Sequence, residues 1–256
     1  MLALRKIILT ESKLFLREPI AVGFGILFPT FILLAIGSIP ALREPSDEFG
    51  GARFVEAWAP SALVVGLGVV ALQHIPAVLA GYREKGVLRR MATTPVRPAT
   101  LLLAQLVVAF TAAAIAAVLV VATAWLMLDV PPPHQPVRFV TSFVVGFGAL
   151  LAIGMFIAAA APNERAANGL AVLTYMVTMF LSGAFLPRFA MPETLLKLSA
   201  YVPPGPQALV ATWSDDPAVV TMAGQVESGS LLAQLGVMVL VAVVAGYPAF
   251  RLFRWD

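Results

Sequence analysis

Residues 81–98, GYREKGVLRRMATTPVRP, separate two long uncharged runs, Ala57 to Ala80 and Thr100 to Leu128. The basic residues of this segment are Arg83, Lys85, Arg89, Arg90 and Arg97, and its single acid is Glu84. Basic residues in short loops between membrane spans are retained on the cytoplasmic side. The segment therefore predicts two spans joined by a cytoplasmic loop, which offers a soluble partner the largest inner surface of the chain.

The composition places the whole chain in a membrane. Of its 256 residues, 60% are hydrophobic and 12% are charged, whereas soluble domains carry about 25% charged residues. The net charge of +3 is too small for a surface that follows a phosphate backbone, so lipid headgroups and the positive-inside bias explain the basic residues better. The chain has no cysteine, which excludes disulfides and thiolate metal sites.

Six apolar runs reach the length of roughly 20 residues that a helix needs to cross a bilayer. They are Ile20 to Leu42, Ala57 to Ala80, Thr100 to Leu128, Phe139 to Ala161, Ala166 to Leu186 and Leu231 to Phe250. Pro29, Pro40 and Pro76 are expected to kink the first two runs, because proline removes a backbone donor. The predicted fold is all-α, a single polytopic domain over residues 1–256 with six transmembrane helices.

Lysine and arginine are distributed unevenly between the segments that join these runs. With the N-terminus inside, the inner segments hold twelve of the seventeen basic residues. The outer segments hold the other five, Arg43, Arg53, Arg138, Arg188 and Lys197. The positive-inside rule then places both termini in the cytoplasm of a multi-pass protein of the cell membrane.

Two segments outside the runs are predicted to be structured. Residues 1–18 combine apolar and basic side chains as an amphipathic helix in the inner headgroup layer does, although simple positive-inside flanking of the first span is an alternative. Residues 187–230 form the largest outer region, and their first part is too rich in proline and apolar residues for a polar loop. We expect a short re-entrant or interfacial helix pair there, followed by a solvated loop from Asp215 to Gly229.

A search for enzymatic chemistry finds little. The glycine spacing of residues 81–98 begins like a phosphate-binding loop, but Val87 and Leu88 stand where Lys and Ser or Thr are required. The two histidines, His74 and His134, lie in different segments, and His74 is interpreted as a polar residue near the inner end of a span rather than a metal ligand. Glycine pairs inside the runs are interpreted as helix-packing positions. We therefore predict a transport subunit without enzyme activity, metal or cofactor of its own.

The absence of charge within the predicted spans bears on the class of transport. Carriers coupled to protons or sodium place ionisable groups at mid-membrane, whereas the six runs contain no Asp, Glu, Lys or Arg. The energy must then come from elsewhere, or transport is passive. A path lined by Phe, Met, Leu and Ala suits an amphipathic or apolar solute better than a small ion, which needs a ring of charges or carbonyls.

Two motifs resemble the membrane permease of type-2 ABC exporters, the drug-efflux and polysaccharide-export branch. One is the charged segment that ends in TPVRP, Thr94 to Pro98. The other is LSGAFLP, which ends at Pro187 and is followed by Met191 and Pro192. Together with the six runs and the basic N-terminus, the resemblance covers nearly the whole chain.

The resemblance implies a division of labour between subunits. In that family the loop after the second span forms a coupling helix in a cleft of a separate ATPase, which binds ATP and Mg, and two permeases pair around the solute path. A helix from Tyr82 to Met91 would place Leu88 and Met91 on one side. Family members often carry a further acid a few positions after the first Glu, where this chain has arginines. The coupling residues implied are Arg83, Glu84, Lys85, Leu88, Arg89, Arg90 and Met91.

The LSGAFLP motif is expected to form an external gate or a re-entrant turn after the fifth run. The alternative is a simple span end at Pro187, which cannot continue a helix. The expected gate residues are Leu181, Ser182, Gly183, Phe185 and Pro187.

These observations predict the transmembrane subunit of an ATP-driven ABC exporter for an amphipathic drug, lipid or glycan. Its expected partners are two copies of a nucleotide-binding ATPase, a second permease copy or homologue, membrane lipids and the solute, and no nucleic acid. A six-span scaffold or assembly factor without a transport path is the main alternative. A passive channel is least favoured, because rings of charge are lacking.

Overall fold

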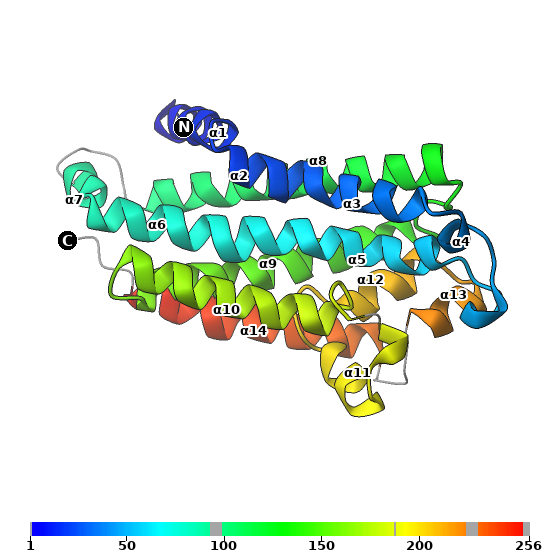
Figure 1. Ribbon diagram of the computed structural model, residues 1–256. Coiled ribbons are helices and arrows are strands. Elements are labelled where there is room, and N and C mark those ends of the chain that lie inside the picture. The colour runs from blue at the N-terminus through cyan, green and yellow to red at the C-terminus, as the bar shows by residue number, and fades with distance from the viewer. Residues whose placement is uncertain (1, 93–98, 187, 224–229, 253–256) are drawn as a thin grey trace.

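The computed structural model describes residues 2–92, 99–186, 188–223 and 230–252. Within these ranges every regular element is a helix, which confirms the all-α prediction. The long helices lie side by side in one bundle, and short helices gather at its two ends (Figure 1).

Five helical stretches of the described chain are long and apolar enough to cross a membrane. The first comprises α2 (Pro19–Val22), η1 (Gly23–Leu27) and α3 (Phe28–Gly37), and the second comprises α5 (Phe54–Gly68), η3 (Val69–His74) and α6 (Ile75–Glu84). The other three are α8 (Ala99–Leu128), α9 (Pro136–Ala160) and α14 (Leu231–Leu252).

The fifth predicted run forms α10 (Glu164–Ser182), which is not among these five stretches. Its first turns contain Glu164, Arg165 and Asn168, and these polar residues lower the hydropathy of a helix of only 19 residues. In Figure 1, α10 nevertheless runs alongside the long helices.

Prolines shape the first two stretches differently from the prediction. Pro29 and Pro76 each follow a π-helical segment, in which the amide before the proline bonds to the carbonyl five residues earlier. The wider turn makes room for the proline ring, so the helix continues. Pro40 does not kink the first span, because α3 ends at Gly37 and Pro40 begins a separate helix, α4 (Pro40–Arg43).

The second stretch lies at the centre of the bundle. In its most apolar window 83% of the residues are buried, compared with 33% in the first and third stretches and 11% in α14. A Cβ atom at Gly66 of α5 would come within 2.6 Å of the Gly25 carbonyl oxygen of η1. These two glycines therefore allow close helix packing, as the sequence predicted.

The short helices form two groups at opposite ends of the bundle (Figure 1). One end holds α1 (Leu2–Leu16), α7 (Val87–Ala92) and the last turn of α14. The other end holds α4, η2 (Asp47–Phe49), η4 (Arg188–Ala190), α11 (Glu193–Ser199), α12 (Pro206–Trp213) and α13 (Pro217–Met222). Helix α1 falls within residues 1–18, and its placement in the headgroup layer stays a prediction.

The described part of residues 187–230 contains four short helices, η4, α11, α12 and α13, and the re-entrant or interfacial placement expected for a helix pair there stays a prediction. Helix α12 packs against α5, α9 and α14. The amides of His134 and Gln135 donate to the carbonyl oxygens of Trp213 and Thr212 at its C-terminus, at 2.9 and 3.1 Å. These bonds satisfy carbonyls that a buried helix end would leave without donors.

The solvated loop expected from Asp215 to Gly229 is wrong for its first part. Helix α13 buries Val219 and Met222 in a small apolar cluster. Asp216 accepts a hydrogen bond from the amide of Ala218 at 2.9 Å, so it caps this helix. The remaining residues, 224–229, lie outside the described ranges.

Candidate functional site

The predicted coupling helix is divided into two. Helix α6 ends at Glu84, Gly86 has a left-handed φ of 66°, and α7 starts at Val87. A right-handed helix cannot pass through that conformation, and glycine is the residue that adopts it at least cost. The continuous helix from Tyr82 to Met91 was therefore wrong, and residues 83–91 instead form a bend, here named the α6–α7 corner.

Arg83 points into the bundle. Its Nη1 donates to the carbonyl oxygens of Ala158 at 3.1 Å and Ala159 at 3.4 Å, and its Nη2 donates to that of Ala161. These are carbonyls at the C-terminal end of α9, where a helix has unsatisfied acceptors and a negative partial charge. The guanidinium therefore caps α9 and connects it to α6.

Glu84 makes the complementary contact. Its Oε2 accepts from the backbone amide of Glu164, the first residue of α10, at 3.0 Å. Asn163 also caps this end by accepting from the Ala166 amide at 2.8 Å. Consecutive residues of opposite charge thus contact the negative end of α9 and the positive end of α10. The corner is joined directly to the turn between these two helices.

Leu88 and Met91 face the protein rather than an outside partner. Leu88 is 2% exposed and belongs to the main hydrophobic core, and Met91 is half-buried against that core. A coupling helix that presents these two side chains to the cleft of an ATPase does not fit this arrangement. Leu88 instead anchors α7 to the bundle.

The exposed surface of the corner is mainly cationic. Lys85, Arg89 and Arg90 are all exposed, and Arg90 Nη2 donates to the Lys85 carbonyl oxygen at 3.3 Å. Glu84 is the remaining exposed charge of the corner. The TPVRP motif, including Arg97, lies in residues 93–98, outside the described ranges.

The predicted gate residues lie at the opposite end of the bundle. Helix α10 ends at Ser182 because Gly183 adopts a left-handed φ of 86°, so the end is set by this glycine and not by Pro187. Leu181 and Ser182 are buried, whereas Phe185 is 57% exposed. Pro187 falls outside the described residues.

Arg188 is a buried residue of this end that the sequence did not single out. It is 4% exposed; its Nε donates to the Ala223 carbonyl oxygen at 2.8 Å and its Nη1 to Ser199 Oγ at 2.9 Å. Burial lowers the pKa of its guanidinium to about 10. Its Cγ would lie 2.5 Å from a Cβ at Gly183, so the side chain packs on the end of α10 and connects it to α11 and α13.

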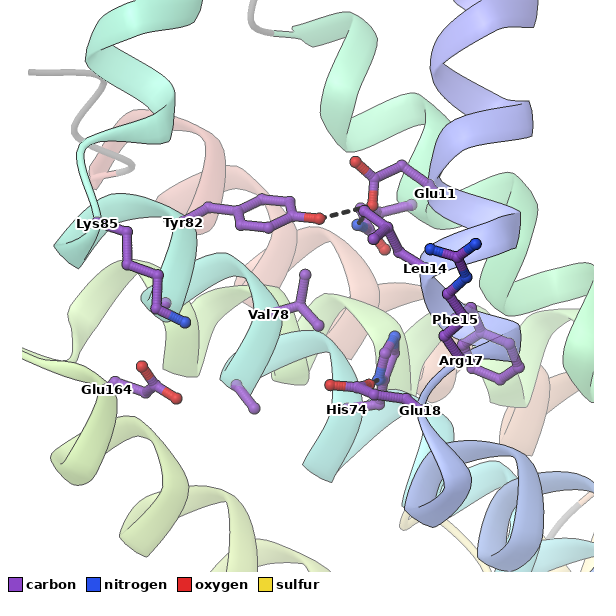
Figure 2. Close-up of a pocket in the computed structure, with 13 residues that line it drawn as sticks. Glu11, Leu14, Phe15, Arg17, Glu18, His74, Val78, Tyr82, Lys85 and Glu164 are labelled. Atoms are coloured by element: carbon purple, nitrogen blue, oxygen red, sulfur yellow. Dashed lines mark hydrogen bonds and ion pairs between the residues drawn. The ribbon is translucent and has the colours of Figure 1, made fainter.

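A second group of polar residues surrounds a cavity of about 360 Å³ beneath α1 (Figure 2). This α1 cavity is lined by residues of α1, η3, α6, α8 and α10 and lies at the same end as the α6–α7 corner. Its titratable lining residues are Glu11, Arg17, Glu18, His74, Tyr82, Lys85 and Glu164.

Glu11 is the deepest carboxylate of the cavity, at 7% exposure. Its Oε2 accepts hydrogen bonds from the Tyr82 hydroxyl at 2.9 Å and from Gln105 Nε2 at 2.6 Å. Burial raises its pKa, and the two hydrogen bonds partly offset that effect. The sequence contained a signal for this role, because Glu11 lies four residues from both Ile7 and Phe15, on the apolar side of α1.

His74 is paired with Glu18 at the edge of the cavity. Its Nδ1 lies 2.7 Å from Glu18 Oε2, and its ring meets that of Phe15 edge to face at a centroid distance of 4.9 Å. Among the residues that the structure describes, no group of three or more His, Asp or Glu side chains is placed to hold a metal.

The family model named ABC-2 type transporter matches residues 3–205. The chain belongs to the ABC-2 type transporter family. The match confirms the resemblance of the sequence to type-2 ABC permeases and includes α1, the α6–α7 corner and the predicted gate residues. A comparison with curated proteins gives no match.

Membership makes this ABC-2 chain a transmembrane subunit of an ABC transporter and a multi-pass membrane protein. The family supplies the transport path rather than a catalytic centre, and its members typically work with an ABC ATPase subunit that binds the nucleotide. The geometry described above now allows the roles of individual residues to be proposed.

Proposed function

We propose that this ABC-2 subunit forms the path of an ATP-driven exporter for an amphipathic drug, lipid or glycan, and that a separate ATPase docks at the α6–α7 corner. The observation that carries the proposal is the corner itself. Its outer surface presents Lys85, Arg89 and Arg90, while Arg83, Glu84 and Leu88 connect it to three parts of the bundle. A docking element must be exposed on one side and fixed on the other.

The roles of the seven predicted coupling residues then separate into two groups. Lys85, Arg89 and Arg90 make charge-assisted hydrogen bonds to acidic groups of the ATPase. Leu88 and Met91 hold α7 in place, and Arg83 and Glu84 pass its displacement to the turn between α9 and α10.

We further propose that α10 is a sixth transmembrane helix and that both termini are cytoplasmic. At 1.5 Å per residue a 19-residue helix is about 28 Å long, which is close to the thickness of roughly 30 Å of the hydrocarbon core. Six crossings bring α1, α7 and the end of α14 to the same side, which carries most of the basic residues. The positive-inside rule supports that side as the cytoplasmic one.

An apolar groove supports a solute with an apolar body. It lies between α8 and α9, has a volume of about 960 Å³ and includes Phe110, Trp125, Phe139 and Phe143 in its lining. The groove has the lining expected of a path formed with a second permease copy or homologue. We assign the outer gate to Leu181, Ser182, Gly183 and Phe185, at the end of the bundle opposite the α6–α7 corner.

The proposal is tested by co-expressing the subunit with an ABC ATPase subunit from the same organism and measuring co-purification and ATP-driven solute transport in proteoliposomes. Replacing Lys85, Arg89 and Arg90 together by Gln should abolish both. The matched control replaces three exposed cations of α1, Arg5, Lys6 and Lys13, in the same way. Full co-purification by the first variant, or equal losses in both variants, would refute docking at the corner. Co-purification without any transport would favour a scaffold.

A further inference from the structure

The α1 cavity arranges its charges by depth. Glu11 is buried inside it, whereas Arg17, Lys85 and Glu18 are exposed, and Glu18 is paired with His74. Figure 2 shows Glu11, Arg17 and Glu18 along one side of the cavity and Lys85 and Glu164 along the other, with Tyr82 reaching between them toward Glu11. A ligand that fits this order carries a positive group at its inner end and a negative group nearer the surface.

The buried carboxylate is held in position for such a ligand. Both described hydrogen bonds of Glu11, from Tyr82 and from Gln105, end on Oε2, and neither uses Oε1. Both donors are neutral, so neither balances the charge of the carboxylate. Burial of a carboxylate without a cation is unfavourable, which the raised pKa of Glu11 reflects. A cationic group in the cavity would remove that penalty.

We propose that the α1 cavity binds the headgroup of a zwitterionic aminophospholipid, with its primary ammonium at Glu11 and its phosphate at Arg17, which lies on the same side of the cavity. The inference rests on the proposed placement of α1 in the inner headgroup layer, but it does not depend on ATP-driven transport. The volume of about 360 Å³ is at the small end of the range of roughly 300 to 1,000 Å³ for ligand pockets, which suits a headgroup better than a whole amphiphile.

The ammonium type follows from the chemistry of the carboxylate. A primary ammonium donates up to three N–H bonds, so it can bond to Glu11 Oε1 and keep further N–H groups for other acceptors. A trimethylammonium group has no N–H and is larger, and a glycerol headgroup carries no positive charge. The cavity should therefore distinguish phosphatidylethanolamine from phosphatidylcholine and from phosphatidylglycerol with identical acyl chains.

The test is a lipid titration of the purified full-length subunit in detergent, followed by native mass spectrometry. Phosphatidylethanolamine should bind about tenfold more tightly than phosphatidylcholine, because a charge-assisted bond to a buried carboxylate is lost with the latter. Glu11→Gln keeps the size of the side chain and removes its charge, so it should abolish the preference. The matched control Glu193→Gln changes an exposed acid of α11 and should retain it.

A second arm separates a lipid headgroup from a transported amine. Arg17→Gln should weaken the binding of both phospholipids and leave the binding of dodecylamine, which has no phosphate, unchanged. Equal binding of the two phospholipids by the unmodified subunit would overturn the proposal even if Glu11→Gln fails to fold. Dodecylamine binding as tight as that of phosphatidylethanolamine would also overturn it, in favour of a site for cationic solutes. Loss of transport with intact lipid preference would count against the exporter alone.

Discussion

Replacing Arg83 by Met should uncouple the transporter without detaching its ATPase. Arg83 contacts α9 and not the outside, through hydrogen bonds to the carbonyl oxygens of Ala158, Ala159 and Ala161. Methionine retains an aliphatic side chain and removes the guanidinium donors. The three carbonyls at the C-terminal end of α9 would then lose their charged partner.

The structure sets the size of the effect. A hydrogen bond to a charged group contributes about 1.5 to 3 kcal/mol net, and a cation at a helix C-terminus contributes about 0.3 to 2 kcal/mol. One guanidinium shared by three carbonyls cannot provide three full bonds, so we expect a loss of about 2 to 3 kcal/mol. For a chain of this size such a loss lowers Tm by roughly 4 to 12 °C.

The assay compares Arg83→Met with Arg89→Met in the purified complex. Arg83→Met should lower the Tm measured by fluorescence-detected size-exclusion chromatography, retain the ATPase and reduce the solute transported per ATP hydrolysed. Arg89 is exposed, so Arg89→Met should change the free energy of unfolding by less than about 0.5 kcal/mol while weakening ATPase binding. An unchanged Tm and coupling ratio in Arg83→Met would refute the role assigned to this side chain.

Four further predictions follow from other contacts. Leu88→Ala should destabilise the packing of α7 on the bundle by about 2 to 5 kcal/mol. Hydrogen exchange in α7 should become faster, and ATPase binding should become weaker although all the cations of the corner are retained. Arg188→Met should speed proteolysis of the outer helices at low protease concentration, because the bonds to Ala223 and Ser199 are lost; equal digestion of both proteins would contradict this. Folding raises the pKa of Glu11, so the folded protein binds the proton of this carboxyl more tightly than the unfolded chain does. The Tm should therefore fall as the pH rises from the ordinary Glu range through the raised pKa, and Glu11→Gln should reduce this dependence of Tm on pH. In intact cells an impermeant thiol reagent should label Ser46→Cys and spare Arg90→Cys, and the reverse pattern would invert the proposed topology.

Hydropathy predicted most of the helices, because a bilayer demands long apolar helices. Hydropathy did not predict where helices bend or end, because the local backbone conformation determines those positions. The bend at Gly86 and the end of α10 at Gly183 both depend on a left-handed glycine, and a glycine after a helix is a known stop signal. The sequence analysis instead predicted kinks at prolines, although Pro29 and Pro76 lie within continuous helices.

The contact partners of each charged side chain were harder to predict than its place along the chain. The basic residues of the corner were found from the sequence, but Arg83 and Glu84 contact residues about 75 to 80 positions away. No periodic pattern within one segment indicates such a partner. Glu11 differs, because its place on the apolar side of an amphipathic helix could have marked it as a buried acid in need of donors.

The central helix α5–η3–α6 contacts both the α6–α7 corner and the predicted gate. At one end α6 leads into the corner through Glu84 and Lys85. At the other end Ser61 Oγ of α5 donates to the carbonyl oxygen of Ser182, the last residue of α10, at 3.4 Å. The helix between them is continuous and mostly buried, with one π-helical segment before Pro76. An ATPase that moves α7 therefore need not act through loops, because one helix carries a displacement at Lys85 to the residues beside Gly183. We expect that helix to bend at its π-helical segment η3.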